Sequence, residues 1–160
     1  MKNTFLKTIG TATLAILMMA MFAQISVSAQ DISRPLEGVW NAQATAINCQ
    51  TGAVIRTGPA ILTFVRGGTM HDFGTGRNPA TRSPGYGIWS FNSNGQYTSA
   101  FQFFIYHSDG TLGGRMIVRQ QIQLNSDENS YTSTTTTQVL DVNGNVIMNG
   151  CSNGVGTRFQ

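Results

Sequence analysis

Charged side chains are scarce in this sequence, at 11% of 160 residues, whereas ordinary soluble domains carry roughly 25%. This composition argues against a coiled coil, which is built largely from Ala, Glu, Lys, Leu and Arg, and against a charged disordered tail. A formal net charge of only +3 also argues against a polybasic nucleic-acid binder. The length predicts a single folded domain.

Lysine occurs only at Lys2 and Lys7, just before a largely apolar stretch from residue 9 to residue 25. Small residues follow, with Val27 and Ala29 at the −3 and −1 positions of a cleavage site. This order is typical of a secretory signal peptide, which we expect at residues 1–29. A retained membrane anchor is the alternative, but the stretch is shorter than the ~20 residues that span a bilayer. We therefore expect no stable membrane span after cleavage.

Removal of residues 1–29 leaves eight arginines against seven acidic residues, a net charge of about +1. No nucleic-acid partner is expected at this charge, and the protein is expected to be secreted or periplasmic. Two cysteines remain, Cys49 and Cys151. In an exported protein such a pair forms a disulfide more often than a metal site or a nucleophile, so we expect a Cys49–Cys151 disulfide.

No stretch after residue 30 has the apolar spacing of an amphipathic helix without a Gly or a β-branched run that interrupts it. Turn-forming residues recur instead, and the Asn-Gly and Asp-Gly pairs among them are strong signals of β-hairpins. The turns lie at residues 66–69, 93–96, 108–111, 126–129 and 142–145. They separate runs rich in Val, Ile, Thr, Phe and Tyr, which predict strands at about 38–48, 58–66, 69–74, 86–92, 96–107, 111–124, 130–140 and 145–159.

The run 111–124 alternates apolar and polar side chains, so one face of the predicted strand is buried and the other is wet. Strands of this kind in uninterrupted hairpin order predict an all-β domain over residues 30–160, an antiparallel up-and-down β-barrel of about eight strands. A sandwich is the alternative, but it more often needs a long crossover. The one long loop, 74–85, would lie at the rim of a barrel, as a ligand-contact segment or as a plain connector.

Gly38-Val39-Trp40 opens the first predicted strand, and Arg158 lies in the last. This pairing resembles the calycin superfamily, the lipocalins and their bacterial relatives, in which a Gly-x-Trp motif starts the first strand. The resemblance implies a lipocalin-like barrel with structural roles for both residues: Trp40 plugs the closed end and Arg158 lies across it in a cation–π contact. The segments 82–89 and 101–105 also resemble small exported bacterial proteins of unassigned function, which implies no activity.

Period two places Ala42, Ala44 and Ala46 on the same inward face as Trp40. Three small side chains in a row leave volume inside a barrel. That volume is either filled by large residues from facing strands or lines a ligand cavity. The aromatic residues expected to fill or line it are Phe64, Trp89, Tyr97, Phe101 and Phe103. Hydroxyl groups on residues 131–137 would orient a ligand if they face inward, and otherwise face water.

Groups suited to catalysis or metal binding are few. His71-Asp72 and His107 with Asp109 do not supply the three or four ligands of a zinc site. A Gly-x-Ser-x-Gly motif is missing, and the acidic pair at 127–128 falls in a predicted hairpin turn. We therefore expect no catalytic residue, no metal and no cofactor.

Three arginines, Arg66, Arg77 and Arg82, fall in or near the long loop. They would receive an anionic ligand or a partner's acidic surface, or they are scattered solvated charges.

The leading functional hypothesis is non-catalytic binding of a small, largely apolar ligand inside an exported, lipocalin-like barrel. One alternative is a barrel enzyme of the allene oxide cyclase-like type, in which pocket shape and a few polar groups guide a reaction. The other is a structural or interaction protein with a filled barrel. A small apolar ligand is thus the expected partner, and the sequence assigns no oligomeric state.

Overall fold

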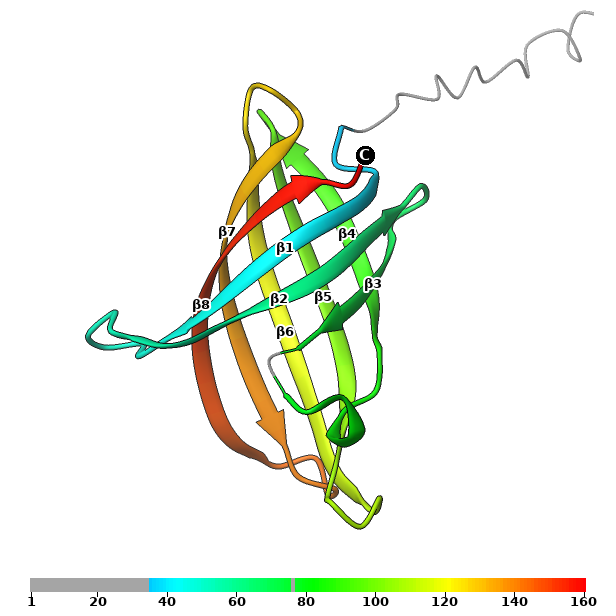
Figure 1. Ribbon diagram of the computed structural model, residues 1–160, viewed down its shortest axis with the longest axis vertical. Helices are drawn as coiled ribbons and strands as arrows, with labels where there is room; N and C mark the ends of the chain where they lie inside the picture. The colour runs from blue at the N-terminus through cyan, green and yellow to red at the C-terminus, as the bar shows by residue number, and fades with distance from the viewer. Residues whose placement is uncertain (1–34, 76) are drawn as a thin grey trace, which may run out of the picture. The chain divides into compact units, whose positions relative to one another are not determined.

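The computed structural model describes residues 35–75 and 77–160, so the expected signal peptide at 1–29 lies outside the described residues. The described chain forms eight strands and one short 3-10 helix, shown in Figure 1. In chain order they are β1 Gly38–Ile47, β2 Val54–Val65, β3 Thr69–Gly74, η1 Pro79–Thr81, β4 Gly85–Ser93, β5 Gln96–Tyr106, β6 Leu112–Leu124, β7 Ser130–Leu140 and β8 Val146–Arg158.

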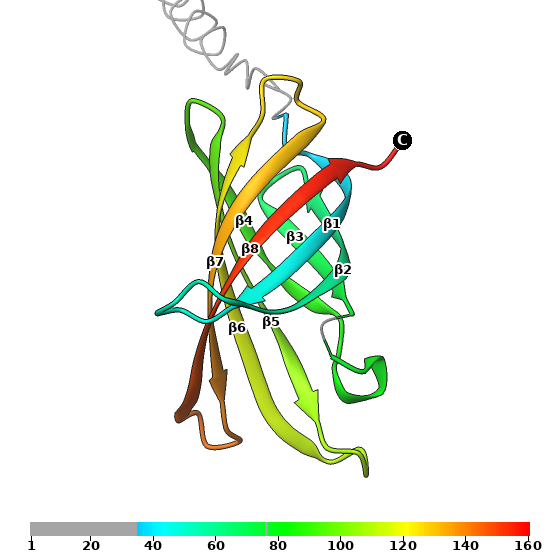
Figure 2. The ribbon, with the colours of Figure 1, turned by 60° about the vertical axis from the view of Figure 1, so that its left-hand side comes forward.

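The eight strands form a closed barrel in which each strand pairs antiparallel with its neighbours in the chain. β1 and β8 complete the ring, with Trp40 opposite Arg158 and Ile47 opposite Cys151. Figure 2 shows these two strands side by side. The prediction of an all-β, antiparallel, up-and-down barrel is confirmed.

Alternating side chains and tight turns produce these strands. In β6, the buried residues Val118 and Ile122 are separated by the exposed residues Arg119 and Gln121, which places one face in the barrel and one in solvent. The turn between β4 and β5 has Asn94 at a φ of 48° followed by a glycine at 72°, and a type I′ hairpin turn requires positive φ at both positions.

Strand β2 begins at Val54, earlier than the predicted start at residue 58. Pro59 suggests a strand boundary in the sequence because proline lacks an N–H donor. In the structure, β2 pairs with β1 from Val54 to Phe64 but with β3 only from Ala60 to Val65. Pro59 therefore lies where one side of β2 has no partner strand, and the strand continues past it.

One end of the barrel is closed by a packed core around Trp40, which is 0% exposed. The Trp40 indole donates a hydrogen bond to the Leu36 carbonyl (2.9 Å), and the Tyr131 ring packs against it at 5.1 Å. The Arg158 guanidinium lies 4.4 Å from the Trp40 ring and donates to the carbonyls of Pro35, Glu37 and Glu128. These contacts join the start of β1, the end of β8 and the turn between β6 and β7.

Glycines in β8 allow side chains of β7 to lie across its backbone. A Cβ at Gly156 would come within 2.1 Å of the Tyr131 ring, and one at Gly154 within 2.4 Å of the Ser133 hydroxyl. Tyr131 lies opposite Gly156 and Ser133 opposite Gly154 in the β7–β8 register. The inner face of β8 therefore has no side chains at these two positions. The side chains of β7 occupy that space instead.

Cys49 and Cys151 form a disulfide, with their Cα atoms 5.3 Å apart. Cys49 lies in the hairpin between β1 and β2, and Cys151 lies within β8. The bond therefore links the first hairpin to the last strand, beside the β1–β8 pairing that closes the ring.

Replacing both cysteines with serine is expected to lower the free energy of unfolding by about 2–4 kcal/mol, because a long loop is no longer closed in the unfolded chain. Urea denaturation followed by tryptophan fluorescence measures this change. The wild-type protein treated with reductant is the matched control, and it should lose the same amount. Equal stability of the oxidised protein and the double variant would show that the bond contributes nothing.

Candidate functional site

A cavity of about 760 Å³ occupies the part of the barrel lumen that adjoins the Trp40 core, and Tyr131 forms part of its wall. Its lining comes from the inward faces of strands around the ring and from the segment between β3 and β4. The inward-facing residues on it include Ala42, Ala44, Ala46, Gly58, Ala60, Leu62, Phe101, Phe103, Met116, Val118, Gln120, Tyr131, Ser133, Thr135, Thr137, Gly150, Ser152 and Gly154. Asp72, Arg56, Arg77 and Arg82 add charge to it.

Small residues on β1 and β2 leave the lumen unfilled. Ala42, Ala44 and Ala46 line the cavity, and in the β1–β2 register Ala44 faces Gly58. Ala44 points inward and its side chain is still accessible, and the cavity that it lines is not closed off from solvent. The alternation that predicted these alanines as inward-facing thus places them where a ligand would lie.

The opposite wall is apolar. Phe101 and Phe103 on β5 line the cavity together with Met116 and Val118 on β6, and the paired strands place Phe101 opposite Val118 and Phe103 opposite Met116. These side chains offer a continuous surface to an apolar ligand, because such contacts gain free energy in proportion to the area removed from water.

The other three aromatic residues of the expected lining lie elsewhere. All five of these aromatic residues belong to the buried core cluster, but Phe64, Trp89 and Tyr97 are not among the residues that line the lumen cavity. The Trp89 ring contacts both of the others, with ring centroids 5.9 Å apart in each case. Large residues therefore fill one part of the barrel and line the cavity in the other.

Strand β7 presents hydroxyl groups on both of its faces. Ser133, Thr135 and Thr137 line the cavity, whereas Thr134 and Thr136 are exposed. The Ser133 side chain is buried, and its hydroxyl has no hydrogen-bond partner within the described residues. Buried polar groups are nearly always satisfied, and no group within the described residues satisfies this hydroxyl.

The segment between β3 and β4 completes the barrel wall. β3 pairs with β4 only from Thr69 to Asp72, and beyond that point the segment reaches β5 instead. There the Ser83 amide donates to the Phe104 carbonyl (3.0 Å), and the Ser83 hydroxyl accepts from the Phe104 amide (3.0 Å). The predicted rim loop is therefore part of the wall beside the cavity.

Arg82 anchors this segment with a buried ion pair. Its guanidinium donates to the Asp72 carboxylate and to the Gly74 carbonyl, and it lies 3.8 Å from the centre of the Phe103 ring. The side chains of Arg82 and Asp72 are only 8% and 6% exposed. Burial raises the pKa of the Asp72 carboxyl, although the Arg82 charge and hydrogen bond act in the opposite direction.

The three arginines that the sequence suggested as an anion-binding group do not all lie at the cavity. Arg77 and Arg82 line the cavity, but Arg66 forms an ion pair with Glu37 (3.1 Å). Arg56 joins the cavity, although the sequence hypothesis did not include it. It lies opposite Ala46 in the β1–β2 register, so the extension of β2 to Val54 is what brings it to the lumen.

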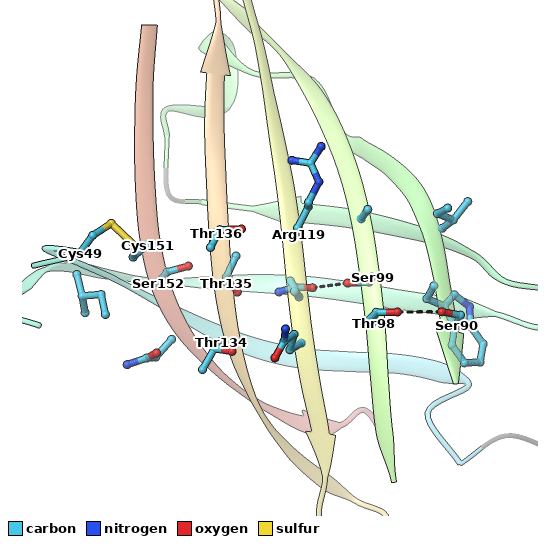
Figure 3. Close-up of a pocket in the computed structure, with 17 residues that line it drawn as sticks. Cys49, Ser90, Thr98, Ser99, Arg119, Thr134, Thr135, Thr136, Cys151 and Ser152 are labelled. Carbon is cyan, nitrogen blue, oxygen red and sulfur yellow. Dashed lines mark hydrogen bonds between the residues drawn. A yellow bond between two sulfur atoms is a disulfide. The ribbon is translucent and has the colours of Figure 1, made fainter. Parts of the chain in front are cut away.

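A second concavity, of about 660 Å³, lies over the middle of strands β4 to β8. Figure 3 shows Thr134 and Thr136 beside Arg119, with Ser90 and Thr98 on the neighbouring strands. Many of the polar side chains that line it already form hydrogen bonds with other side chains of the protein. Ser90 bonds to Thr98 (2.9 Å), Ser99 donates to Gln120 (2.9 Å) and Arg119 donates to Gln138 (3.0 Å). The lumen cavity is the better candidate.

Comparison with protein-family models and with curated proteins finds no match to this chain. The closed eight-stranded antiparallel barrel is consistent with a calycin-like fold. No group of three or more His, Cys, Asp and Glu side chains suited to a metal comes together within residues 35–75 and 77–160. Over the same residues, no helix is long and apolar enough to cross a membrane.

Proposed function

We propose that this protein is an exported, lipocalin-like barrel that binds a small, largely apolar ligand in its lumen. The observation that carries the proposal is the solvent-connected cavity of about 760 Å³, within the roughly 300–1,000 Å³ of small-molecule sites. Its apolar wall provides binding energy, and its few hydroxyl and charged groups would orient the ligand. A barrel filled by its own side chains does not fit this volume.

Export is supported by the Cys49–Cys151 disulfide, because disulfides form and persist in oxidising compartments. The signal-peptide pattern of residues 1–29 supports the same location. A secreted or periplasmic protein with an open apolar cavity would capture ligands outside the cytoplasm.

Native mass spectrometry of protein purified from its own periplasm or medium tests the proposal directly. A co-purified small molecule is the expected result. A second assay uses a neutral fluorescent probe, N-phenyl-1-naphthylamine, and asks whether lipids or pigments displace it from the protein. The proposal would be overturned if no adduct is found repeatedly and no compound displaces the probe.

Filling the lumen from β1 should weaken binding without unfolding the barrel. Ala44→Phe places a large ring in the cavity, and we expect the affinity for N-phenyl-1-naphthylamine to fall by about tenfold or more, roughly 1.4 kcal/mol. Asn41→Phe is the matched control, because Asn41 is exposed on the same strand and does not line the cavity. Fluorescence titration measures both variants, and an equal affinity for the two would place the site elsewhere.

An enzyme that uses the same cavity is the second candidate, and Asp72 favours it. Its carboxyl lines the cavity, and burial raises its pKa, as is common for acid–base groups in active sites. The ion pair with Arg82 gives this carboxyl a structural role as well. Incubating the co-purified ligand with fresh protein separates the candidates: a ligand unchanged in both mass and chromatographic retention indicates binding, and a new product that Asp72→Asn protein fails to form indicates catalysis.

A further inference from the structure

The charges on the lumen cavity do not balance. Four charged residues line it, Arg56, Arg77, Arg82 and Asp72. Asp72 is paired with Arg82, which leaves Arg56 and Arg77 without a carboxylate within salt-bridge distance in the described chain. The cavity therefore carries an excess of two positive charges beside an apolar wall.

Arg77 is held in an unfavourable position. Its Nε is buried and has no hydrogen-bond partner within the described residues. Burial lowers the pKa of Arg77, and the positive charges of Arg56 and Arg82 lower it further. A buried donor without a partner costs free energy, as does the approach of like charges. An anion bound between Arg56 and Arg77 would offset the repulsion between their charges.

The charged and apolar surfaces of the cavity come from different elements of the barrel. Arg56 comes from the start of β2 and Arg77 from the segment between β3 and β4, whereas Phe101, Phe103 and Met116 come from β5 and β6. A ligand that satisfies both surfaces at once needs an anionic group at one end and an apolar body beyond it. A wholly apolar ligand would leave the guanidinium groups unpaired.

We propose that the ligand of this cavity is an anionic amphiphile, with its carboxylate or phosphate head group bound by Arg56 and Arg77 and its apolar chain lying along the β5–β6 wall. This inference rests on the proposed ligand-binding function. Guanidinium groups suit both head groups, because their planar N–H donors match carboxylate and phosphate oxygens. Arg82 is already occupied by Asp72 and the Gly74 carbonyl, so it positions the segment that carries Arg77.

Four ligands of equal chain length test the head group. Decanoate, decyl phosphate, decanol and decyltrimethylammonium are titrated below their micelle concentrations against protein loaded with N-phenyl-1-naphthylamine. We expect the anions to bind about tenfold or more tightly than decanol, since charge-assisted hydrogen bonds contribute more than neutral ones, and the cation to bind most weakly. The stronger of the two anions identifies the head-group class.

The Arg56→Gln/Arg77→Gln double variant should lose about tenfold or more of its affinity for the anions and keep its affinity for decanol. Arg115→Gln is the matched control, because Arg115 is exposed on β6 and does not line the cavity. Equal binding of anion and alcohol by the wild-type protein would overturn this inference and leave the proposed function standing. Binding of none of the four ligands, with no probe signal, would overturn both. Thermal denaturation verifies that each variant is folded.

Discussion

Replacing Arg82 with methionine is expected to lower the free energy of unfolding by about 3–5 kcal/mol near neutral pH, because it leaves a buried carboxylate without its cation. The Asp72 side chain is only 6% exposed in the folded protein, so its carboxylate is poorly hydrated. The variant also loses the hydrogen bond to the Gly74 carbonyl and the contact with the Phe103 ring. Urea denaturation of both proteins measures the difference.

The stability deficit of Arg82→Met should depend on pH. The folded-state pKa of Asp72 is already raised above its ordinary value, and loss of the nearby cation raises it further. A raised carboxyl pKa contributes stability at low pH that is lost as pH rises through the folded pKa. The deficit should therefore be larger at about pH 8 than at about pH 5.

Asp72→Asn added to Arg82→Met is the matched control, since it removes the charge that was left unpaired. This double variant should be more stable than Arg82→Met at about pH 8 and should lose the pH dependence of the deficit. An identical deficit at both pH values in the single variant would show that Asp72 is not the group responsible.

Trp40→Ala is expected to destabilise the barrel by about 3–5 kcal/mol, through lost burial and the cavity left behind. The indole is 0% exposed, and it contacts the Tyr131 ring, the Arg158 guanidinium and the Leu36 carbonyl. Its removal thus loosens three segments at the closed end together. Thermal or urea denaturation provides the measurement.

Phe104→Ala is the control for Trp40→Ala, because Phe104 is 49% exposed on the outer face of β5. Surface substitutions usually change stability by within about 0.5 kcal/mol. Trp40 does not line the lumen cavity, so the fraction of Trp40→Ala protein that remains folded should still bind the neutral probe. Comparable losses for the two variants would contradict a sealing role for Trp40.

The fold could be predicted from the sequence because its signals are local. Turns such as Asn94-Gly95 mark where strands end, and alternation along β6 marks which face is buried. Neighbouring strands in hairpin order then need only one long-range pairing, that of β1 with β8, to close the ring. The boundary of β2 could not be predicted in this way, because the tolerance of Pro59 depends on where β3 ends.

The residues of the site could be predicted only in part. Whether an inward-facing residue lines the cavity depends on its distance from the closed end of the barrel, and alternation along a strand does not give that distance. Alternation placed Ala42, Ala44 and Ala46 inward, and they line the cavity. The same rule does not separate Phe101, which lines the cavity, from Tyr97, which does not, because both are buried core residues that face inward on β5.

The charged part of the site was hidden for a different reason. Asp72 and Arg82 are ten residues apart across a loop, and the path of that loop is set by its contacts with β5 rather than by its own sequence. Arg56 had a usable signal in its period-two spacing from Gly58 and Ala60, once β2 is extended past Pro59.

The position of the chain ends has a practical consequence. β1 begins and β8 ends at the barrel end sealed by Trp40, where Gly38 and the Arg158 side chain lie close together on neighbouring strands. Attachment of the protein to a sensor surface through its C-terminal residue therefore leaves the opening, at the other end, facing the solution. Ligand libraries can then be passed over the immobilised protein without the support obstructing the lumen.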